Sequence, residues 1–476
     1  MTGCSPIGSI AADARGGDVT DEAGLPAILR CPRCADGRLY LQRAGWICQS
    51  CSSGYPVIGE IPWLFAEPQT TLFEWRARLD FLLLELDREV RVLRSELAAT
   101  TLLPETRRRL ELLADANEGH AQRLRRILEP LGLGGSQTAY ETHLALRTRL
   151  PADQGLTNYY VNVHRDWVWG EAENEASVAL IESVVSPAHT WGRTLVLGAG
   201  AGRLAYDLHR RARPALTVAT DFNPLLLFVA REVTQGRPVE LYEFPIAPRR
   251  LEDHAILRQL AAPEPVPPGF FLIGADALRA PFAAGAFDTV VTPWLIDVIA
   301  EDLPTFAARL NGLLRPGGSW INFGSLVFSQ AERALRFGLE ETLVIAQQAG
   351  FSDMQLREEV IPYMASPASR HARRESVLAW CARKERPVAA PAAHSALPEW
   401  LIATSLPVPQ LEDFKVQQVA TRIHAFLMAL IDGRRSVQDM ARMLVEQRLM
   451  APADAEPAVR TFLTRMYEDS RHRAGY

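Results

Sequence analysis

The sequence predicts an α/β protein with a Rossmann-like sheet, and the segment after Thr194 carries most of that prediction. A short apolar run, Thr194–Leu197, stops at the alternating glycines Gly198, Gly200 and Gly202, and helical spacing follows. Asp221 comes after the next apolar run. Because glycine has no Cβ, the backbone can turn sharply there and approach a ligand, and an acidic residue after the next strand can hold two ribose hydroxyls. The segment therefore predicts a nucleotide-type cofactor site.

Later segments continue the α/β pattern. The apolar strand Phe287–Thr292 precedes the helical pattern of Leu303–Leu314, and an Arg-Pro-Gly-Gly turn at 315–318 leads into the strand Ser319–Phe323. A dinucleotide-binding turn would have its third glycine where this chain has Arg203, so NAD is not the obvious ligand. The order of the segments resembles the class I S-adenosylmethionine-dependent methyltransferases. The resemblance implies a seven-stranded Rossmann-like sheet that binds S-adenosylmethionine.

Composition limits the class of protein. The chain is 48% hydrophobic and 22% charged with a net charge of −5, which gives no overall attraction to nucleic acid or anionic lipid. Met1–Arg15 lacks a basic start with an apolar core, and no apolar run has transmembrane length, so we expect a cytoplasmic protein with no membrane partner. Six cysteines in so long a chain do not make a disulfide scaffold, and Cys4 and Cys381 are expected to be unpaired thiols.

Four of the cysteines form two CxxC pairs with thirteen residues between them: Cys31, Cys34, Cys48 and Cys51. Each pair can offer two thiolates from a tight turn, and four sulfurs can close a tetrahedron around Zn²⁺ with no open position. The pattern predicts a structural zinc site; a redox pair is the alternative. With the tail Tyr55–Phe65, residues 28–65 resemble Trm112-like zinc-binding domains, although Glu60 interrupts the tail motif. The resemblance implies a module that docks on or stabilises a methyltransferase; the alternative is a ribbon that merely folds.

Long charged helices are predicted between Thr71 and Leu131. Leucines and a valine at three- and four-residue steps mark one apolar stripe in the first helix, which is a core face or, alternatively, a coiled-coil seam. Acidic residues interleave the arginines of the second helix, Glu105–Leu128, so a solvated face is favoured over a nucleic-acid surface.

Spaced motifs over roughly residues 72–384 resemble the carnosine N-methyltransferase family, formerly described as N2227-like. They are Arg165-Asp-Trp167, the turn Gly198–Ala205, Leu295-Ile-Asp297, the stretch Arg315–Ser329 and Ile361-Pro-Tyr363. The resemblance implies cofactor-binding roles: Arg165 for the methionine carboxylate, Gly198, Gly200, Gly202 and Arg203 for the turn beneath the cofactor, Asp221 for the ribose and Asp276 for the adenine edge. Asp288 is expected to be structural.

The same resemblance places the methyl acceptor beside Asp297 and Tyr363, the two candidate catalytic residues. Asp297 follows a strand at the edge of the sheet where open α/β folds bind ligands, which favours a substrate contact; a helix cap or a buried salt bridge is the alternative. A carboxylate there could orient an N–H group. Where the family has a Leu-Leu-Tyr-His stretch, this chain has Leu326–Ser329. Phe328 and Ser329 supply neither a phenol nor an imidazole, so the acceptor is expected to differ from carnosine.

Beyond a Pro- and Ala-rich linker, the C-terminal segment predicts helices at Val419–Leu430 and Val437–Gln447, with Ser436 capping the second and Asp454 capping a third. Residues 430–440 resemble winged-helix-like or PqqD-like modules that recognise peptides; accessory packing is the alternative. The expected domains are a tail over 1–27, the zinc ribbon over 28–68, a helical connector over 69–150, the methyltransferase domain over 151–384, a linker over 385–399 and a small helical domain over 400–476.

These patterns predict an S-adenosylmethionine-dependent methyltransferase whose acceptor is an imidazole- or amine-containing small molecule or peptide. A catalytically silent methyltransferase fold that binds partners through its zinc ribbon and C-terminal domain is the alternative, and a nicotinamide-dependent oxidoreductase is a third. The sequence does not predict an oligomeric state.

Overall fold

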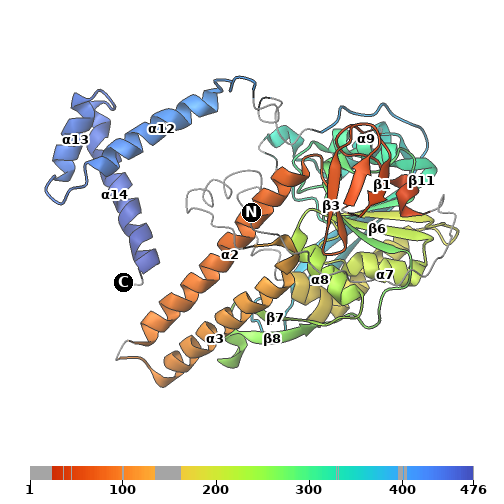
Figure 1. The fold of residues 1–476 in the computed structure, drawn as a ribbon, viewed down its shortest axis with the longest axis horizontal. Coiled ribbons are helices and arrows are strands. Elements are labelled where there is room, and N and C mark those ends of the chain that lie inside the picture. Colours follow the sequence, from red (N-terminus) through yellow and green to blue (C-terminus); the bar gives the residue numbers. More distant parts are fainter. Residues whose placement is uncertain are drawn as a thin grey trace, which may run out of the picture. The chain divides into compact units, whose positions relative to one another are not determined.

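The computed structural model describes residues 24–474, apart from 36, 44, 99–100, 134–161, 329, 331, 395–399 and 401–404, with side chains as far as residue 467. The chain divides between residues 393 and 394 into two compact units (Figure 1). The first unit thus holds the cysteine pairs, the long helices and the glycine turn together. The predicted N-terminal tail, with Cys4, lies largely outside the described residues.

A twisted sheet forms the centre of the first unit. Its seven core strands follow the order β9-β6-β5-β10-β11-β13-β12, with β13 antiparallel to both of its neighbours and the strands before it parallel to one another. In that order they span Phe270–Ala275, Leu216–Asp221, Arg193–Leu197, Phe287–Pro293, Leu314–Gly324, Arg373–Lys384 and Phe351–Tyr363. This arrangement confirms the predicted class I methyltransferase fold.

The predicted turn and strand at 315–323 are one continuous strand, β11, in the structure. Leu314 pairs with Phe287 and Ser319 pairs with Thr289, so the register shifts across the Arg-Pro-Gly-Gly segment. Gly317 has φ +74°, a left-handed conformation that glycine adopts without strain. The turn is therefore a bulge within the sheet, and the predicted strand is correct but too short.

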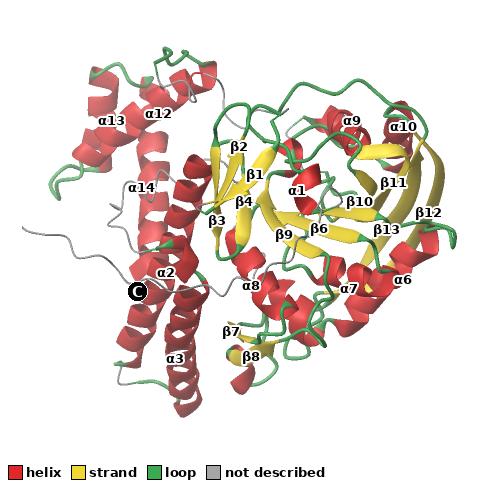
Figure 2. Ribbon diagram, turned by 45° about the vertical axis from the view of Figure 1, so that its right-hand side comes forward, coloured by secondary structure: helices red, strands yellow, loops and turns green. Residues whose placement is uncertain are grey.

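Helices cover both faces of the sheet (Figure 2). Alternate residues of a strand point to opposite faces, and β5 shows this: Leu195 packs in the cluster that contains α9, and Val196 in the cluster that contains α6 and α7. The helices of the two layers are α6 Glu171–Val184, which precedes β5, and α7 Arg203–Ala212, α8 Pro224–Thr234, α9 Leu303–Leu313 and α10 Leu339–Gln348, which come after strands. The fold thus consists of helix, sheet and helix layers.

The cysteine-rich segment extends the sheet at its β9 edge. It contains α1 Leu25–Ile28, β1 Leu39–Gln42, β2 Gly45–Cys48, β3 Gly54–Ile58 and β4 Ile61–Leu64. β4 pairs in parallel with β9 through Trp63↔Gly274 and Leu64↔Ala275, which makes an eleven-stranded sheet. A Cβ on Gly274 would lie 2.4 Å from the Trp63 ring, so glycine lets the indole lie flat against β9.

Two long helices follow the ribbon. α2 spans Pro68–Leu97 and α3 spans Pro104–Ile127, in agreement with the predicted helical connector as far as residue 133. Leu93 packs with Leu110 and Ala114 of α3, and Leu79 is buried in the main core, so the leucine stripe is a core face. Beside α3 lie β7 Val239–Glu243 and β8 Ile256–Leu260, an antiparallel pair (Figures 1 and 2).

Short helical turns complete this unit: η1 Glu129–Leu131, η2 Arg165–Trp169, η3 Glu252–His254, η4 Ala277–Arg279 and η5 Arg333–Leu335. In the part of the chain that the structure describes, no helix combines the length and the apolar character needed to cross a membrane.

The second unit contains α12 Glu412–Ala429, α13 Val437–Glu446 and α14 Pro452–Ala474. Ser436 and Asp439 form a capping box at the start of α13, as the sequence predicts for Ser436. The prediction that Asp454 caps the third helix is wrong, because Pro452 already begins α14 and Asp454 lies in its first turn. Residues 405–474 contain no strand that could serve as the wing of a winged-helix domain.

Candidate active site

The glycine turn joins β5 to α7 at the carboxyl edge of the parallel strands. Gly198, Gly200 and Gly202 have φ angles of +70°, +57° and +84°, which residues with a Cβ rarely adopt. A Cβ on Gly200 would meet nothing within 4 Å, so open space lies beside this backbone. The turn thus combines left-handed backbone with room for a ligand to approach closely.

Asp221 ends the neighbouring strand β6 and is joined to the turn. Its Oδ2 accepts the Gly200 N–H at 2.8 Å, and its Oδ1 accepts the Asn223 N–H at 2.8 Å. Burial raises the pKa of Asp221, and these backbone hydrogen bonds act in the opposite direction. The carboxylate is therefore held rigidly at the strand end, and each oxygen retains a further lone pair for a ligand.

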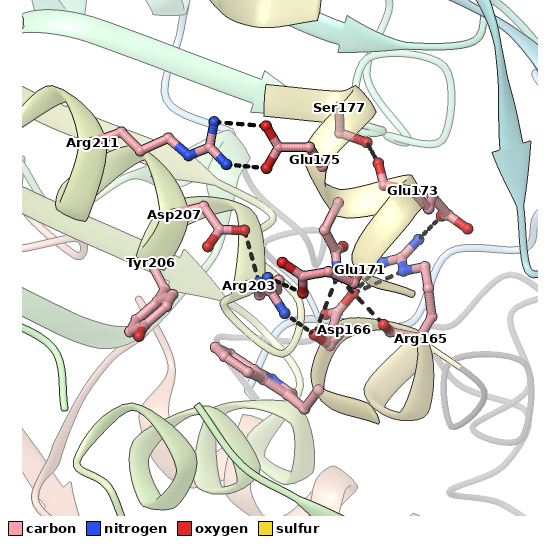
Figure 3. Close-up of polar contacts among 12 residues, drawn as sticks. Arg165, Asp166, Glu171, Glu173, Glu175, Ser177, Arg203, Tyr206, Asp207 and Arg211 are labelled. Carbon is pink, nitrogen blue, oxygen red and sulfur yellow. Dashed lines mark hydrogen bonds and ion pairs between the residues drawn. The ribbon is translucent and has the colours of Figure 1, made fainter. Parts of the chain in front are cut away.

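Arg165 begins η2, a single π-helical turn, and is held by two carboxylates (Figure 3). Its Nε donates to Asp166 Oδ1 at 2.8 Å, and its Nη1 donates to Glu173 Oε1 at 3.2 Å. Burial alone would lower the pKa of Arg165, but the charges of Asp166 and Glu173 outweigh that effect and raise it. Its Nη2 also lies 2.7 Å from Asp166 Oδ1, so the guanidinium stays charged in a nearly buried position and all three of its nitrogens contact one of the two carboxylates.

Arg203 and Trp167 attach η2 to the glycine turn. The Trp167 indole N–H donates to the Ala201 carbonyl at 2.9 Å. Arg203 donates to the Asp166 carbonyl at 2.8 Å and to Asp207 Oδ2 at 2.7 Å (Figure 3). Its guanidinium also lies over the Trp167 ring. Its remaining nitrogen contacts Glu171 at 2.8 Å. All three nitrogens of Arg203 therefore contact groups of the chain itself.

Asp297 lies just beyond β10, at the same edge of the sheet, and is only 3% exposed. Its Oδ2 accepts the Ser325 hydroxyl at 3.1 Å and the Val327 N–H at 2.9 Å. Burial raises its pKa, and the hydrogen bonds partly offset this effect. The structure shows neither of the two alternatives for Asp297: it caps no helix, and it forms no salt bridge with the residues that are described.

Tyr363 ends β12 and lies among aromatic and charged groups. Its ring centroid is 5.1 Å from that of Trp294, and the Arg373 guanidinium lies 4.5 Å from its centroid on the ring face. The next N–H, of Met364, donates to Glu173 Oε2 at 2.8 Å. Glu173 therefore joins Arg165 to the end of β12, and the structure brings Arg165 and Tyr363 into one neighbourhood.

Two residues of this neighbourhood were not predicted. Glu173 lies 191 positions before the Met364 N–H that it binds, and no local sequence pattern predicts such a contact. Trp294 has φ +49°, an uncommon conformation for a residue with a side chain and one that is frequent at functional sites. The aromatic residue directly after the strand of Phe287–Pro293 is the signal that could have identified Trp294.

Asp276 follows β9 and caps η4, accepting the Leu278 N–H at 2.9 Å. Asp288, by contrast, lies at the opposite end of the strands, where it accepts the Arg193 N–H at 2.7 Å and pairs with Arg315. The structural role expected for Asp288 agrees with these contacts.

Phe328 is buried against Phe337, with ring centroids 5.7 Å apart, and Ser329 lies outside the described residues.

The four cysteine sulfurs converge within 4.8 Å of one another. The Cys31–Cys51 and Cys34–Cys48 sulfur pairs are each 3.6 Å apart, close to the spacing of about 3.8 Å that a tetrahedral Zn–S₄ site requires. Backbone N–H groups of both CxxC turns point at sulfurs, as in a thiolate site. The residues therefore fit a structural zinc ion.

The first cysteine turn contacts the segment that carries Asp276. Arg279, in η4, donates to the carbonyls of Pro32 and Arg33, the two residues between Cys31 and Cys34. The Arg30 N–H donates to the Pro281 carbonyl at 2.8 Å. The ribbon is thus hydrogen-bonded to the loop after β9.

The strand order, the glycine turn and the acidic end of β6 define a class I methyltransferase domain. Residues 156–386 match the family model described as carnosine N-methyltransferase, and this part of the chain is carnosine N-methyltransferase-like.

Curated relatives include the carnosine N-methyltransferase of Mus musculus, 26% identical over 221 residues, which covers 41% of this chain and 54% of the relative. The carnosine N-methyltransferase unmet of Drosophila melanogaster is 26% identical over 252 residues, covering 47% and 53%. The chain spans about half the length of these relatives.

Among solved structures, the chain is similar to Haemonchus contortus phosphoethanolamine N-methyltransferase 2 in complex with S-adenosyl-L-methionine. The identity is 15%, the match covers 53% of this chain and 61% of that chain, and the TM-score is 0.32. A possible histamine N-methyltransferase from Thermotoga maritima is 14% identical, with 48% and 94% covered and a TM-score of 0.28.

Proposed function

We propose that the chain is an S-adenosylmethionine-dependent methyltransferase that methylates a nitrogen of an imidazole- or amine-containing small molecule or peptide. The observation that carries the proposal is the joint position of the glycine turn, Asp221, Arg165 and Tyr363. Gly200 offers open space beside left-handed backbone, and its N–H fixes the Asp221 carboxylate. Such a turn beside a strand-end acid suits an adenosyl group.

Each candidate cofactor residue has a distinct task in this proposal. Asp221 accepts the ribose hydroxyls, Asp276 contacts the adenine edge, and Arg165 faces the methionine carboxylate with the two of its five N–H groups that Asp166 and Glu173 do not use. Arg203, the first residue of α7, holds the Arg165 turn against the glycine turn, because it donates to the Asp166 carbonyl at 2.8 Å. Its proposed role is thus positioning within the cofactor site.

When bound, S-adenosylmethionine supplies a methyl group on a positively charged sulfur. The chain itself must hold an unprotonated nitrogen in line with that methyl group. Asp297 Oδ2 is fixed by Ser325 and Val327, so Oδ1 is the oxygen that would accept an N–H of the acceptor. The ring of Trp294 and the face of Tyr363 that Arg373 does not cover would stabilise the positive charge that develops on the acceptor.

The zinc ribbon stabilises the cofactor site in this proposal. Zinc bound by the four cysteines would fix the Pro32 and Arg33 carbonyls, which receive hydrogen bonds from Arg279. Since η4 also contains the Asp276 cap, an ordered ribbon orders the loop expected at the adenine edge.

Calorimetry with S-adenosylhomocysteine tests the proposal. The zinc-loaded chain should bind it, and Asp221→Ala should weaken binding by about tenfold or more, since charge-assisted hydrogen bonds are lost. Asp302→Ala is the matched control: Asp302 likewise accepts a backbone N–H, from Thr305 at 2.9 Å, but caps α9. The control should lose about 1 kcal/mol of stability and no affinity. Absence of binding by the unmodified chain would refute the proposal.

A screen with isotopically labelled methyl donor identifies the acceptor. We expect label on a nitrogen of a histidine-containing compound, an amine or a peptide from a cell extract, and loss of transfer in Asp297→Asn. A chain that binds S-adenosylhomocysteine but labels nothing would support the catalytically silent alternative.

A further inference from the structure

A hollow of about 330 Å³ lies where α3 begins beside the loop that joins β7 to β8. None of its lining residues belongs to the candidate active site. Most of the lining carries or can carry positive charge. The ionisable residues are Arg109, Arg249, Arg250, Arg370, His254 and Glu105. Four arginines thus face one glutamate.

Neutral groups hold two of these arginines in place. Arg249 Nε donates to the Ser369 carbonyl at 2.9 Å, and the Arg370 guanidinium donates to the Pro248 and Arg249 carbonyls. The Arg249 N–H donates to the Ala368 carbonyl at 3.0 Å. Carbonyl oxygens orient a guanidinium without cancelling its charge. The two loops therefore present fixed guanidinium groups whose direct partners are neutral. Asp253, whose carboxylate accepts the Arg250 N–H at 3.0 Å, offsets only part of the positive charge of the four arginines.

The other two guanidinium groups are not held. Arg109 and Arg250 form no side-chain hydrogen bond or ion pair with any residue that the structure describes. Glu105, one helical turn before Arg109, is not within ion-pair distance of it in the described structure. Arg109 and His254 line the same hollow. Burial and then the charge of Arg109 lower the pKa of His254, and the charge of Asp253 acts in the opposite direction. Both guanidinium groups retain their donors for a ligand.

The start of α3 contributes backbone donors to the same hollow. Glu105 and Thr106 belong to its first turn, and the residue before the helix, Leu103, provides no side-chain cap. The first intrahelical hydrogen bond is made by the Arg107 N–H to the Leu103 carbonyl, so the two N–H groups before it have no backbone acceptor among the described residues. Free N–H groups at the start of a 24-residue helix attract anions.

We propose that this hollow binds a phosphate group, either as free phosphate or as the monoester of a small molecule. Guanidinium groups bind phosphate oxygens through two parallel hydrogen bonds, and the helix N–H groups add donors for a third oxygen. The bound dianion offsets the mutual repulsion of four arginines. The proposal is independent of the methyl-transfer chemistry, because none of the lining residues takes part in it.

Titration calorimetry on the full chain at constant salt tests the proposal, with inorganic phosphate and glycerol 2-phosphate as probes. We expect saturable binding that weakens as chloride rises. Arg109→Met and Arg250→Met should each weaken it by about tenfold, and Arg109→Lys by less, because the charge remains while the forked donors are lost. Arg126→Met, an exposed arginine near the other end of α3, is the matched control and should bind normally.

Each outcome bears on the proposal. Binding of both probes assigns the site to phosphate itself, and binding of glycerol 2-phosphate alone assigns it to a monoester. No saturable binding of either probe up to about 10 mM would overturn the proposal. Equal binding by the unmodified chain and the Arg109→Met/Arg250→Met double variant, with unfolding midpoints that match, would overturn it as well.

Discussion

Replacing Arg203 with methionine should destabilise the chain much more than replacing a neighbouring arginine of α7. The Arg203 side chain is 8% exposed and its ion-pair partner Asp207 is 11% exposed, with 2.7 Å between Nε and Oδ2. Removing one partner of a buried ion pair leaves the other charge buried without a partner, at a cost of about 3–5 kcal/mol. Arg211 also pairs with a carboxylate, Glu175, but the two side chains are 37% and 55% exposed (Figure 3). Arg211→Met should therefore cost only about 0–1 kcal/mol.

Urea unfolding of the two variants measures this difference. The double variant Arg203→Met/Asp207→Leu should recover part of the lost free energy of unfolding, because the buried Asp207 carboxylate is then absent. The Arg203 variant should also bind S-adenosylhomocysteine more weakly, since Arg203 holds the Asp166 carbonyl at 2.8 Å beside the Arg165 guanidinium. Equal free energies of unfolding for Arg203→Met and Arg211→Met would refute the reasoning.

Three further outcomes are expected. Gly200→Val should abolish S-adenosylhomocysteine binding in calorimetry, whereas Gly433→Val, at a similar positive φ with open space around it, should leave binding intact. The purified chain should contain zinc by elemental analysis, and Cys48→Ala should lose the metal and unfold at lower temperature, unlike Cys381→Ala; equal metal content in both variants would contradict the ribbon assignment. Burial lowers the pKa of His120 to about 4, so its imidazole stays neutral in the folded chain while the unfolded chain binds a proton below about 6.5. Stability should therefore fall as pH drops from 6 to 5, and His120→Gln should reduce that fall by up to about 1.4 kcal/mol in urea unfolding; an unchanged slope would contradict this.

Local sequence signals predicted the parts of the fold that depend on short-range chemistry. The glycines Gly198 and Gly200 predicted left-handed backbone, and the spacing of the cysteines predicted two turns whose sulfurs converge. The strand order was expected only through the resemblance to class I methyltransferases, because right-handed crossovers fix the hand of each connection but not the point at which the order reverses. Asp221 and the glycine turn come together because the carboxyl ends of adjacent parallel strands meet at one edge.

Long-range contacts were beyond the reach of these signals. The pairing of Trp63 with Gly274 joins segments about two hundred residues apart. An apolar pattern predicts that a segment is a strand, but it does not predict which other strand it pairs with. Glu173 looks like an ordinary residue of a helix start, where acids are favoured by the helix dipole. Its contact with the Met364 N–H exists only because β12 returns to that helix. Such residues are defined by tertiary packing.

The parallel pairing of β4 with β9 has a further consequence for the behaviour of the metal-free chain. Without the ribbon, β9 would be the outermost strand, with a row of unsatisfied N–H and C=O groups facing water. Exposed strand edges of this kind associate with one another. If the four cysteines hold zinc and its loss releases β4 from β9, the metal-free chain should therefore associate edge to edge through β9, and the cysteine turns would then protect the chain against self-assembly.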